Sequence, residues 1–143
     1  MGEEVEVKAA LTNEKIQFTS VARSNPAIIC DYKPPLGDGE GYTGLELLLT
    51  SLAVCSGSTL VFLLRKMRKT VTGLEVHAKG IRREQHPTSF ETIHLDFTLH
   101  SPDADEGDIQ KAVQLSEETY CPVWAMLKNN VEVTTRCSIV SPS

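Results

Sequence analysis

Apolar and polar residues alternate in the first part of the chain, as in half-buried β-strands. The alternation runs through Val5–Ala9 and Ile16–Ser20, with Thr12–Lys15 between them as a turn, and Ala27–Tyr32 is a third short run. Residues 33–41 hold two prolines and three glycines, which predicts a loop. We therefore expect an N-terminal meander of three strands that ends in this loop.

From about Thr43 to Lys69 the apolar period becomes helical. One face of this helix carries a stripe of apolar residues, and further apolar residues beside it make most of the helix circumference apolar. This is typical of a helix that is surrounded on most sides. One chain of this size can hardly cover such a long helix all round, so we expect a subunit interface along it. The predicted inward stripe consists of Leu45, Leu48, Leu52, Cys55, Thr59 and Phe62.

The second half of the chain predicts two strands, two helices and a last strand. The strands lie at residues 74–79 and 92–100, and the first helix spans about residues 105–120, with Ile109, Ala112, Val113 and Tyr120 inward. Cys121-Pro122 breaks this helix and opens a short one over Val123–Lys128, before a strand at Val131–Val140. The order βββ-α-ββ-α-α-β predicts a single α+β domain over residues 1–143, with a largely antiparallel sheet.

Composition narrows the class of protein. The 143 residues, 41% hydrophobic and 23% charged, suit one folded soluble domain, and a net charge of −5 argues against nucleic acid or an anionic membrane as partner. The acidic N-terminus is unlike a signal peptide, and polar residues interrupt the apolar stretch 45–64, so we expect a buried helix and no membrane span. Four cysteines are then expected to be thiols in a reducing cytoplasm.

Cys121 is the first candidate for chemistry. It precedes Pro122, and proline is favoured at the first helical position, so Cys121 is the predicted N-cap of the short helix. Unpaired backbone N–H groups and the helix dipole would there stabilise a thiolate. The alternative is a thiol that only packs beneath Tyr120 and Trp124.

Cys55 lies in the middle of the long helix, on its apolar stripe. One interpretation is a small buried hydrophobic side chain, because free cysteine is often found in that role. The neighbours in Ala53-Val54-Cys55-Ser56-Gly57-Ser58 are small, however, and leave room for a ligand or another backbone to approach the sulfur. If the fold brings Cys55 and Cys121 together, the two thiols are sufficient for two-electron redox chemistry.

Two charged residues are further candidates. Glu46 lies nine residues before Cys55, on the opposite face of a straight helix, and could orient a cation, serve a site across a dimer interface, or face solvent. Arg23 is the only arginine before the long helix, which makes it the default cation for a thiolate; a solvated surface arginine is the alternative.

The remaining reactive residue types give no site. His77, His86, His94 and His100 show no metal-type spacing, and Cys30 and Cys137 are interpreted as packing residues. The sequence has no glycine-rich phosphate loop and no Ser/His/Asp pattern. We therefore expect neither a metal nor a cofactor.

Five segments of the chain together match the motifs of a known superfamily: Glu46–Cys55, Leu64–Met67, Val71–Leu74, His86-Pro87 and Tyr120–Val123. They resemble the OsmC/Ohr superfamily, and the resemblance extends from about residue 40 to 134. It implies an intertwined homodimer of α+β subunits around a long central helix. It also implies reduction of organic hydroperoxides by two cysteines, with a dithiol, of the lipoyl type in the Ohr branch, as the reductant.

The resemblance assigns a role to each candidate cysteine. Cys55 matches the peroxidatic cysteine, whose thiolate attacks the peroxide bond, releases an alcohol and becomes sulfenic acid. Cys121 matches the resolving cysteine, which condenses with the sulfenic acid to a disulfide, and an external dithiol restores both thiols. The apolar surroundings of Cys55 favour alkyl or acyl hydroperoxides over hydrogen peroxide.

The chain departs from the characterised peroxidases of the superfamily at three places. Leu45 stands where they have the catalytic glutamate, with Glu46 shifted by one; Gly44 lies where a proline is usual; and the position of their arginine falls near Asn13–Lys15, which contains none. Arg23 fills that role only if loop lengths differ. With these departures the chain looks more like the OsmC-like branch. Two alternatives to a peroxidase follow: a dithiol redox sensor or small-thiol-binding protein, or a protein that binds a hydrophobic small molecule in an apolar groove beside Cys55.

Overall fold

The computed structural model describes residues 2–142 and divides the chain into two compact units, Met1–Leu48 and Leu49–Ser143. The N-terminal unit holds a three-stranded antiparallel sheet of β1 (Lys8–Leu11), β2 (Phe18–Val21) and β3 (Ile28–Cys30), in the order β1-β2-β3. This is the predicted meander. Its first strand begins later than the expected Val5–Ala9 run, since Val5 and Val7 lie before it and are exposed.

The loop after β3 is organised by one buried carboxylate. Asp31 accepts backbone N–H groups from Tyr32 at 2.8 Å, Asp38 at 3.2 Å and Glu40 at 3.1 Å. These bonds, led by that from Glu40, lower the pKa of Asp31 below its ordinary value. The loop therefore has a defined path between β3 and the long helix.

The long helix α1 (Gly44–Lys66) begins with a capping box. Thr43 N–H donates to Glu46 Oε1 at 2.8 Å, and Glu46 N–H donates to Thr43 Oγ1 at 3.1 Å. Polar residues within the helix are accommodated because their hydroxyls bond back to carbonyls one turn earlier, as Ser56 does to Leu52 and Thr59 does to Cys55. The helix ends close to where the sequence predicts.

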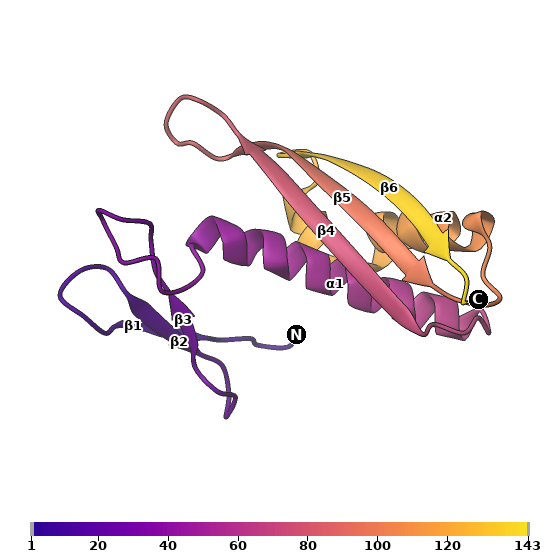
Figure 1. The fold of residues 1–143 in the computed structure, drawn as a ribbon, viewed down its shortest axis with the longest axis horizontal. Helices are drawn as coiled ribbons and strands as arrows, with labels where there is room; N and C mark the ends of the chain where they lie inside the picture. Colours follow the sequence, from indigo (N-terminus) through magenta and orange to yellow (C-terminus); the bar gives the residue numbers. More distant parts are fainter. Residues whose placement is uncertain (1, 143) are drawn as a thin grey trace. The chain divides into compact units, whose positions relative to one another are not determined.

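The C-terminal unit packs α1 and the other helices against a second three-stranded sheet (Figure 1). The sheet consists of β4 (Gly73–Arg82), β5 (Phe90–His100) and β6 (Glu132–Val140), in that order. β4 and β5 are antiparallel, whereas β5 and β6 are parallel, so the sheet is mixed. The predicted largely antiparallel arrangement is wrong for β6. The helical connection after β5 returns the chain to the end of the sheet at which β5 begins, so β6 runs in the same direction as β5.

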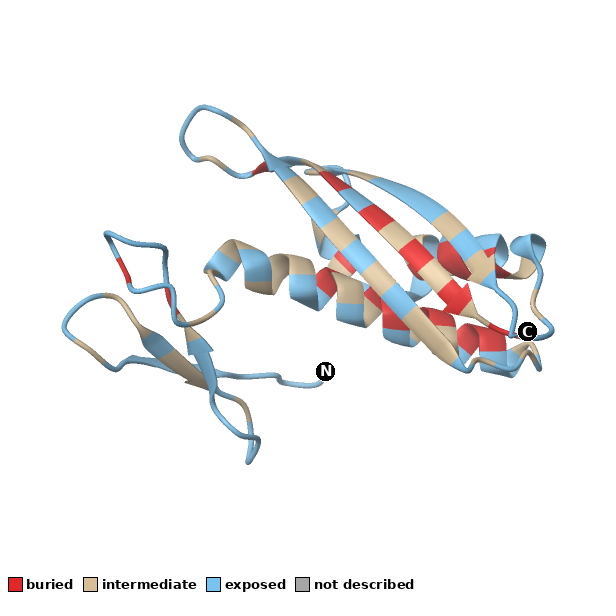
Figure 2. Cartoon of the chain, in the orientation of Figure 1, coloured by how far each residue is buried: buried red, intermediate tan, exposed pale blue. Residues whose placement is uncertain are grey.

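The core of this unit lies between the helices and the central strand β5. Buried and partly exposed residues alternate along β5 (Figure 2). Gly57 lets α1 approach β4 closely, since a Cβ atom there would lie 3.2 Å from Val76 Cγ2. The buried residues of α1 are Leu52, Ser56, Gly57, Leu60, Leu63 and Leu64.

The buried face of α1 is rotated relative to the predicted stripe. Phe62 is 62% exposed and Cys55 is half-buried, whereas Leu60 is fully buried. The apolar residues surround the helix, so their period alone does not determine which side meets the sheet. The predicted inward position of Phe62 is therefore wrong for the single chain.

Three helical segments connect β5 to β6. They are α2 (Glu106–Leu115), the π-helical η1 (Ser116–Tyr120) and α3 (Pro122–Leu127). Ile109, Ala112 and Val113 are buried as predicted, but Tyr120 is 53% exposed. The π turn inserts an extra residue into the helical path, which rotates Tyr120 out of the stripe that a continuous α-helix would bury.

Candidate active site

Cys121 is the N-cap of α3, as the sequence predicts. Its backbone is extended (φ −88°, ψ 105°), Pro122 occupies the first turn, and Cys121 Sγ accepts the N–H of Trp124 at 3.5 Å. The N–H of Cys121 donates to the carbonyl of Ser116 at 2.9 Å. The side chain is 2% exposed, so the sulfur is fixed inside the C-terminal unit.

The fold brings the thiols of Cys55 and Cys121 together. The Cys55 thiol lies close enough to act on the pKa of the Cys121 thiol, although 65 residues separate the two along the chain. Cys55 comes from the middle of α1 and is half-buried, whereas Cys121 comes from the start of α3 and is buried. A small reactant could therefore reach Cys55 first, with Cys121 behind it.

The expected thiolate at Cys121 is not what the structure favours. Burial raises the pKa of Cys121 from 9.0 to about 11, and the Cys55 thiol adds to that rise. The N–H groups of Trp124 and Val123 act in the opposite direction but do not compensate. The N-cap geometry is as predicted, but its electrostatic consequence is outweighed by desolvation, and Cys121 holds its proton at neutral pH.

The other two cysteines, Cys30 and Cys137, form no disulfide in the described part of the chain. All four cysteines are free thiols. Cys137 is half-buried on β6, and burial together with the carboxylates of Asp96 and Glu106 raises the pKa of its thiol. Cys30 ends β3 in the N-terminal unit and forms an isolated parallel bridge with Tyr42. Both lie within strand patterns, as the sequence predicts.

Glu46 and Arg23 belong to the N-terminal unit. Glu46 stabilises the start of α1 through its capping box with Thr43. Arg23 is exposed in the turn between β2 and β3, and its φ of 56° lies in the left-handed region that non-glycine residues seldom adopt. The catalytic roles of these two residues stay predictions.

Two of the four histidines, His94 and His100, make local contacts on the second sheet. His94 bonds to Thr134, and His100 Nε2 lies 2.8 Å from Glu75 Oε1. Within residues 2–142, no three His, Cys, Asp or Glu side chains gather in a way that could hold a metal ion.

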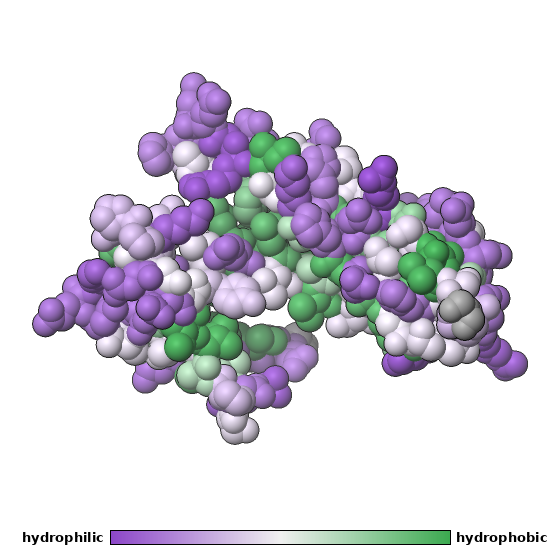
Figure 3. Space-filling view, in the orientation of Figure 1, coloured by the Kyte–Doolittle hydropathy of each residue, from purple (hydrophilic) through white to green (hydrophobic). Residues whose placement is uncertain are grey.

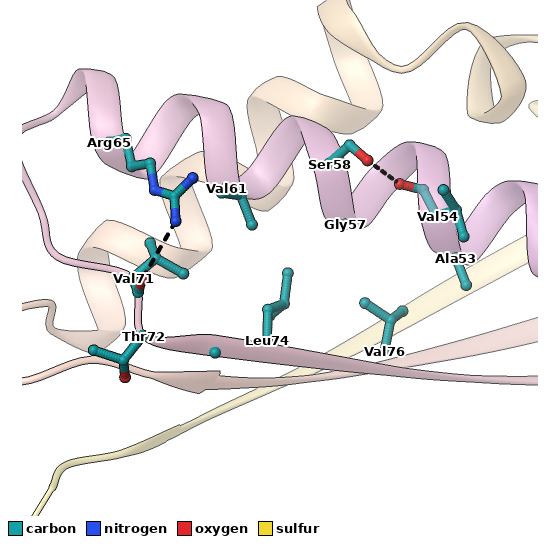
Figure 4. A pocket seen from close by; sticks show the side chains of 11 residues that line it. Ala53, Val54, Gly57, Ser58, Val61, Arg65, Val71, Thr72, Leu74 and Val76 are labelled. Atoms are coloured by element: carbon teal, nitrogen blue, oxygen red, sulfur yellow. Dashed lines mark hydrogen bonds between the residues drawn. The ribbon is translucent and has the colours of Figure 1, made fainter.

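An apolar groove lies between α1 and β4. It has a volume of about 470 Å³; Ala53, Val61, Leu74 and Val76 face one another across it, and Arg65 lies at one end, where it donates to the carbonyl of Val71 at 3.4 Å (Figure 4). Cys55 is not among its lining residues, so the groove runs along a neighbouring face of the same helix. The sequence led us to expect a groove beside Cys55, and its observed position differs because it depends on how α1 crosses β4.

With this geometry in place, comparison with known proteins identifies the family. A family model described as OsmC-like protein matches residues 37–136. The chain belongs to the OsmC-like family. Protein YhfA of Escherichia coli K12 is 34% identical to it over 97 residues, which cover 68% of this chain and 72% of YhfA.

Two solved structures share the fold over nearly the whole chain. A hypothetical protein from Aquifex aeolicus VF5 is 31% identical, with a TM-score of 0.87 over 99% of this chain and 100% of that one. An organic hydroperoxide resistance protein from Elizabethkingia anophelis, crystallised with thiocyanate bound, is 16% identical, with a TM-score of 0.71 over 98% and 100%. At the latter identity the likeness concerns the fold alone.

The pKa of Cys121 has a consequence for stability. Between pH 9.0 and about 11 the unfolded chain releases the Cys121 proton while the folded chain keeps it. Stability from this thiol is therefore present below pH 9 and falls as the pH rises, by about 2.7 kcal/mol in all. Urea unfolding of the wild type and Cys121→Ala at pH 8 and pH 10.5 should show the wild type losing more stability. Equal losses in both proteins would contradict the raised pKa.

Proposed function

We propose that this protein is a thiol-dependent peroxidase that reduces organic hydroperoxides with Cys55 and Cys121. The contact between the two thiols carries the proposal. A half-buried thiol in front of a buried, protonated one suits a reaction in which the peroxide first oxidises Cys55 and Cys121 then forms a disulfide with the oxidised Cys55. Membership of a family that shares its fold with organic hydroperoxide resistance proteins supports the substrate class.

The proposed cycle has three steps. The Cys55 thiolate attacks the peroxide O–O bond, an alcohol leaves, and Cys55 becomes sulfenic acid. Cys121 then attacks the Cys55 sulfur, a disulfide forms, and the oxygen leaves as water. An external dithiol, of the lipoyl type in our proposal, exchanges with the disulfide and restores both thiols. The cycle requires neither metal nor cofactor.

Turnover with a defined peroxide tests this proposal. We expect the reduced protein to consume cumene hydroperoxide in the presence of dihydrolipoamide, and Cys55→Ser to abolish turnover because the attacking sulfur is lost. Cys121→Ser should retain one oxidation event per Cys55 but lose turnover with the dithiol. Cys137→Ser, which alters a thiol outside the pair, should behave as the wild type. A wild type without turnover with any dithiol would exclude the peroxidase.

A charged residue in a strained turn is proposed to assist Cys55. An exposed arginine at a φ of 56° costs about 1 kcal/mol relative to glycine, and backbone strain of this kind is often kept at functional sites. We propose that Arg23 supplies the positive charge that stabilises the Cys55 thiolate. Glu46, at the start of α1, is proposed to orient that guanidinium.

Arg68 offers a matched control for Arg23, since it is also exposed and has a φ of 65°. Replacing either arginine by glycine relieves the same backbone strain. We expect Arg23→Gly to lower kcat/KM for cumene hydroperoxide at least about tenfold, the effect of losing a charge interaction of ~1.4 kcal/mol. Arg68→Gly should not. Equal activity in both variants would remove Arg23 from the proposed site.

We propose that the protein is a soluble cytoplasmic homodimer, in which the outer face of α1 is covered. Among the described residues α1 is the one helix long and apolar enough to cross a membrane, and a third of its most apolar window is buried within the single chain. Val54 and Phe62 are 61% and 62% exposed, and apolar side chains reach the surface around α1 and β4 (Figure 3). We propose that a second copy covers this face, as exposed apolar patches often mark subunit interfaces.

Charge placed on this face should separate the subunits. Wild-type protein is expected at twice 15.7 kDa by light scattering, and Phe62→Asp at the mass of one chain, since burying a carboxylate in the interface is costly. Met126 is 74% exposed on α3, and Met126→Asp serves as the control that stays dimeric. A wild type with the mass of a single chain would contradict the dimer.

The apolar groove favours a second function, the binding of a hydrophobic small molecule. Its volume suits a small organic ligand, and Arg65 would attract an anionic group at one end. Because Cys55 does not line it, this function would not require the thiols. Two results together would favour binding over catalysis: a wild type without peroxidase turnover, and a ligand affinity that is unchanged in a Cys55→Ser, Cys121→Ser double variant.

A further inference from the structure

Ser116 carries a buried hydroxyl group without a partner. The residue is fully buried, and its Oγ is the one buried side-chain nitrogen or oxygen atom in the described part of the chain that makes no hydrogen bond. Ser56 is equally buried, but its hydroxyl donates to the carbonyl of Leu52 at 2.7 Å. A buried hydroxyl without a partner destabilises the fold, so a role in another state of the protein would explain it.

Ser116 is joined directly to the candidate redox site. Its carbonyl accepts the N–H of Cys121 at 2.9 Å, a bond that spans five residues and closes the π turn η1. Both side chains are buried in the C-terminal unit, at the two ends of that turn. π turns occur as single insertions in α-helices and often lie at functional sites. A small adjustment of this turn would alter the position of Cys121 relative to the Ser116 hydroxyl.

The proposed function, on which this inference rests, requires Cys121 to become a nucleophile. In the dithiol state the Cys121 sulfur accepts a hydrogen bond from the backbone of Trp124, and burial favours the protonated thiol. Attack on a sulfenic acid at Cys55 requires negative charge to develop on this sulfur. A further hydrogen-bond donor would stabilise that charge, because hydrogen bonds to charged groups are stronger than neutral ones.

We propose that the Ser116 hydroxyl donates a hydrogen bond to the Cys121 sulfur as Cys121 attacks the sulfenic acid of Cys55. In this step the S–S bond forms and the S–O bond of Cys55 breaks. The departing hydroxide takes the proton released by Cys121 and leaves as water. Cys121 is oxidised and the Cys55 sulfur is reduced, so the step needs no other electron donor. Rotation of the free hydroxyl and adjustment of η1 would bring the donor to the sulfur.

The lifetime of the sulfenic acid tests the role of Ser116. Reduced full-length protein is treated with one equivalent of cumene hydroperoxide, and the sulfenic acid is trapped with dimedone at successive times and measured by intact mass. We expect Ser116→Ala to lengthen its lifetime about tenfold, as for a lost hydrogen bond to a charged group, with the first oxidation of Cys55 unchanged. The pH at which resolution is half-maximal should rise by about one unit, which a purely structural role would not cause.

Two variants complete the experiment. Ser116→Thr keeps the hydroxyl and should resolve as fast as the wild type, and Ser56→Ala removes a buried hydroxyl that already has a partner and should leave the lifetime unchanged. Ser116→Ala is expected to fold, because it removes an unsatisfied group and alanine favours helices. A folded Ser116→Ala variant that resolves the sulfenic acid at the wild-type rate would overturn the role of Ser116 and leave the proposed function standing. A wild type that forms no disulfide would overturn the proposed function as well.

Discussion

The contact between two sulfurs from different helices is the interaction on which the redox chemistry depends. Cys55 is fixed by α1, whose buried face rests on the second sheet, and Cys121 is fixed as the N-cap of α3 by Pro122 and the N–H of Trp124. The parallel strand β6 requires a long helical connection after β5, and that connection delivers Cys121 to α1. The topology of the sheet and the pairing of the thiols are therefore linked.

The two thiols differ because the fold gives them different surroundings. Cys121 lies at a helix start that favours negative charge, but burial is the stronger effect and raises the pKa of its thiol. Cys55 lies at the margin of the buried face of α1 and is half-buried. A protonated, enclosed sulfur behind a more accessible one is a suitable arrangement for a resolving and an attacking cysteine, as proposed above.

The sequence was sufficient to predict the helices and strands and to recognise the family, because both depend on local residue patterns. The bounds of α1, the N-cap at Cys121 and the strands β4 and β5 follow from apolar period, proline and alternation. The buried face of α1 could not be predicted, since apolar residues surround it and only the sheet selects Leu60 over Phe62. The exposure of Tyr120 depends on the π turn, and the pKa of Cys121 on tertiary burial, neither of which a linear pattern contains.

Oxidation with diamide tests the central contact independently of any peroxide substrate. The reduced protein is oxidised under native conditions, its remaining thiols are blocked, and the disulfide-linked peptides are mapped by mass spectrometry. Because the two sulfurs already meet, we predict one intramolecular disulfide between Cys55 and Cys121, with Cys30 and Cys137 recovered as blocked thiols. Recovery of Cys55 and Cys121 as unlinked thiols, or linkage of either to Cys30 or Cys137, would contradict the account.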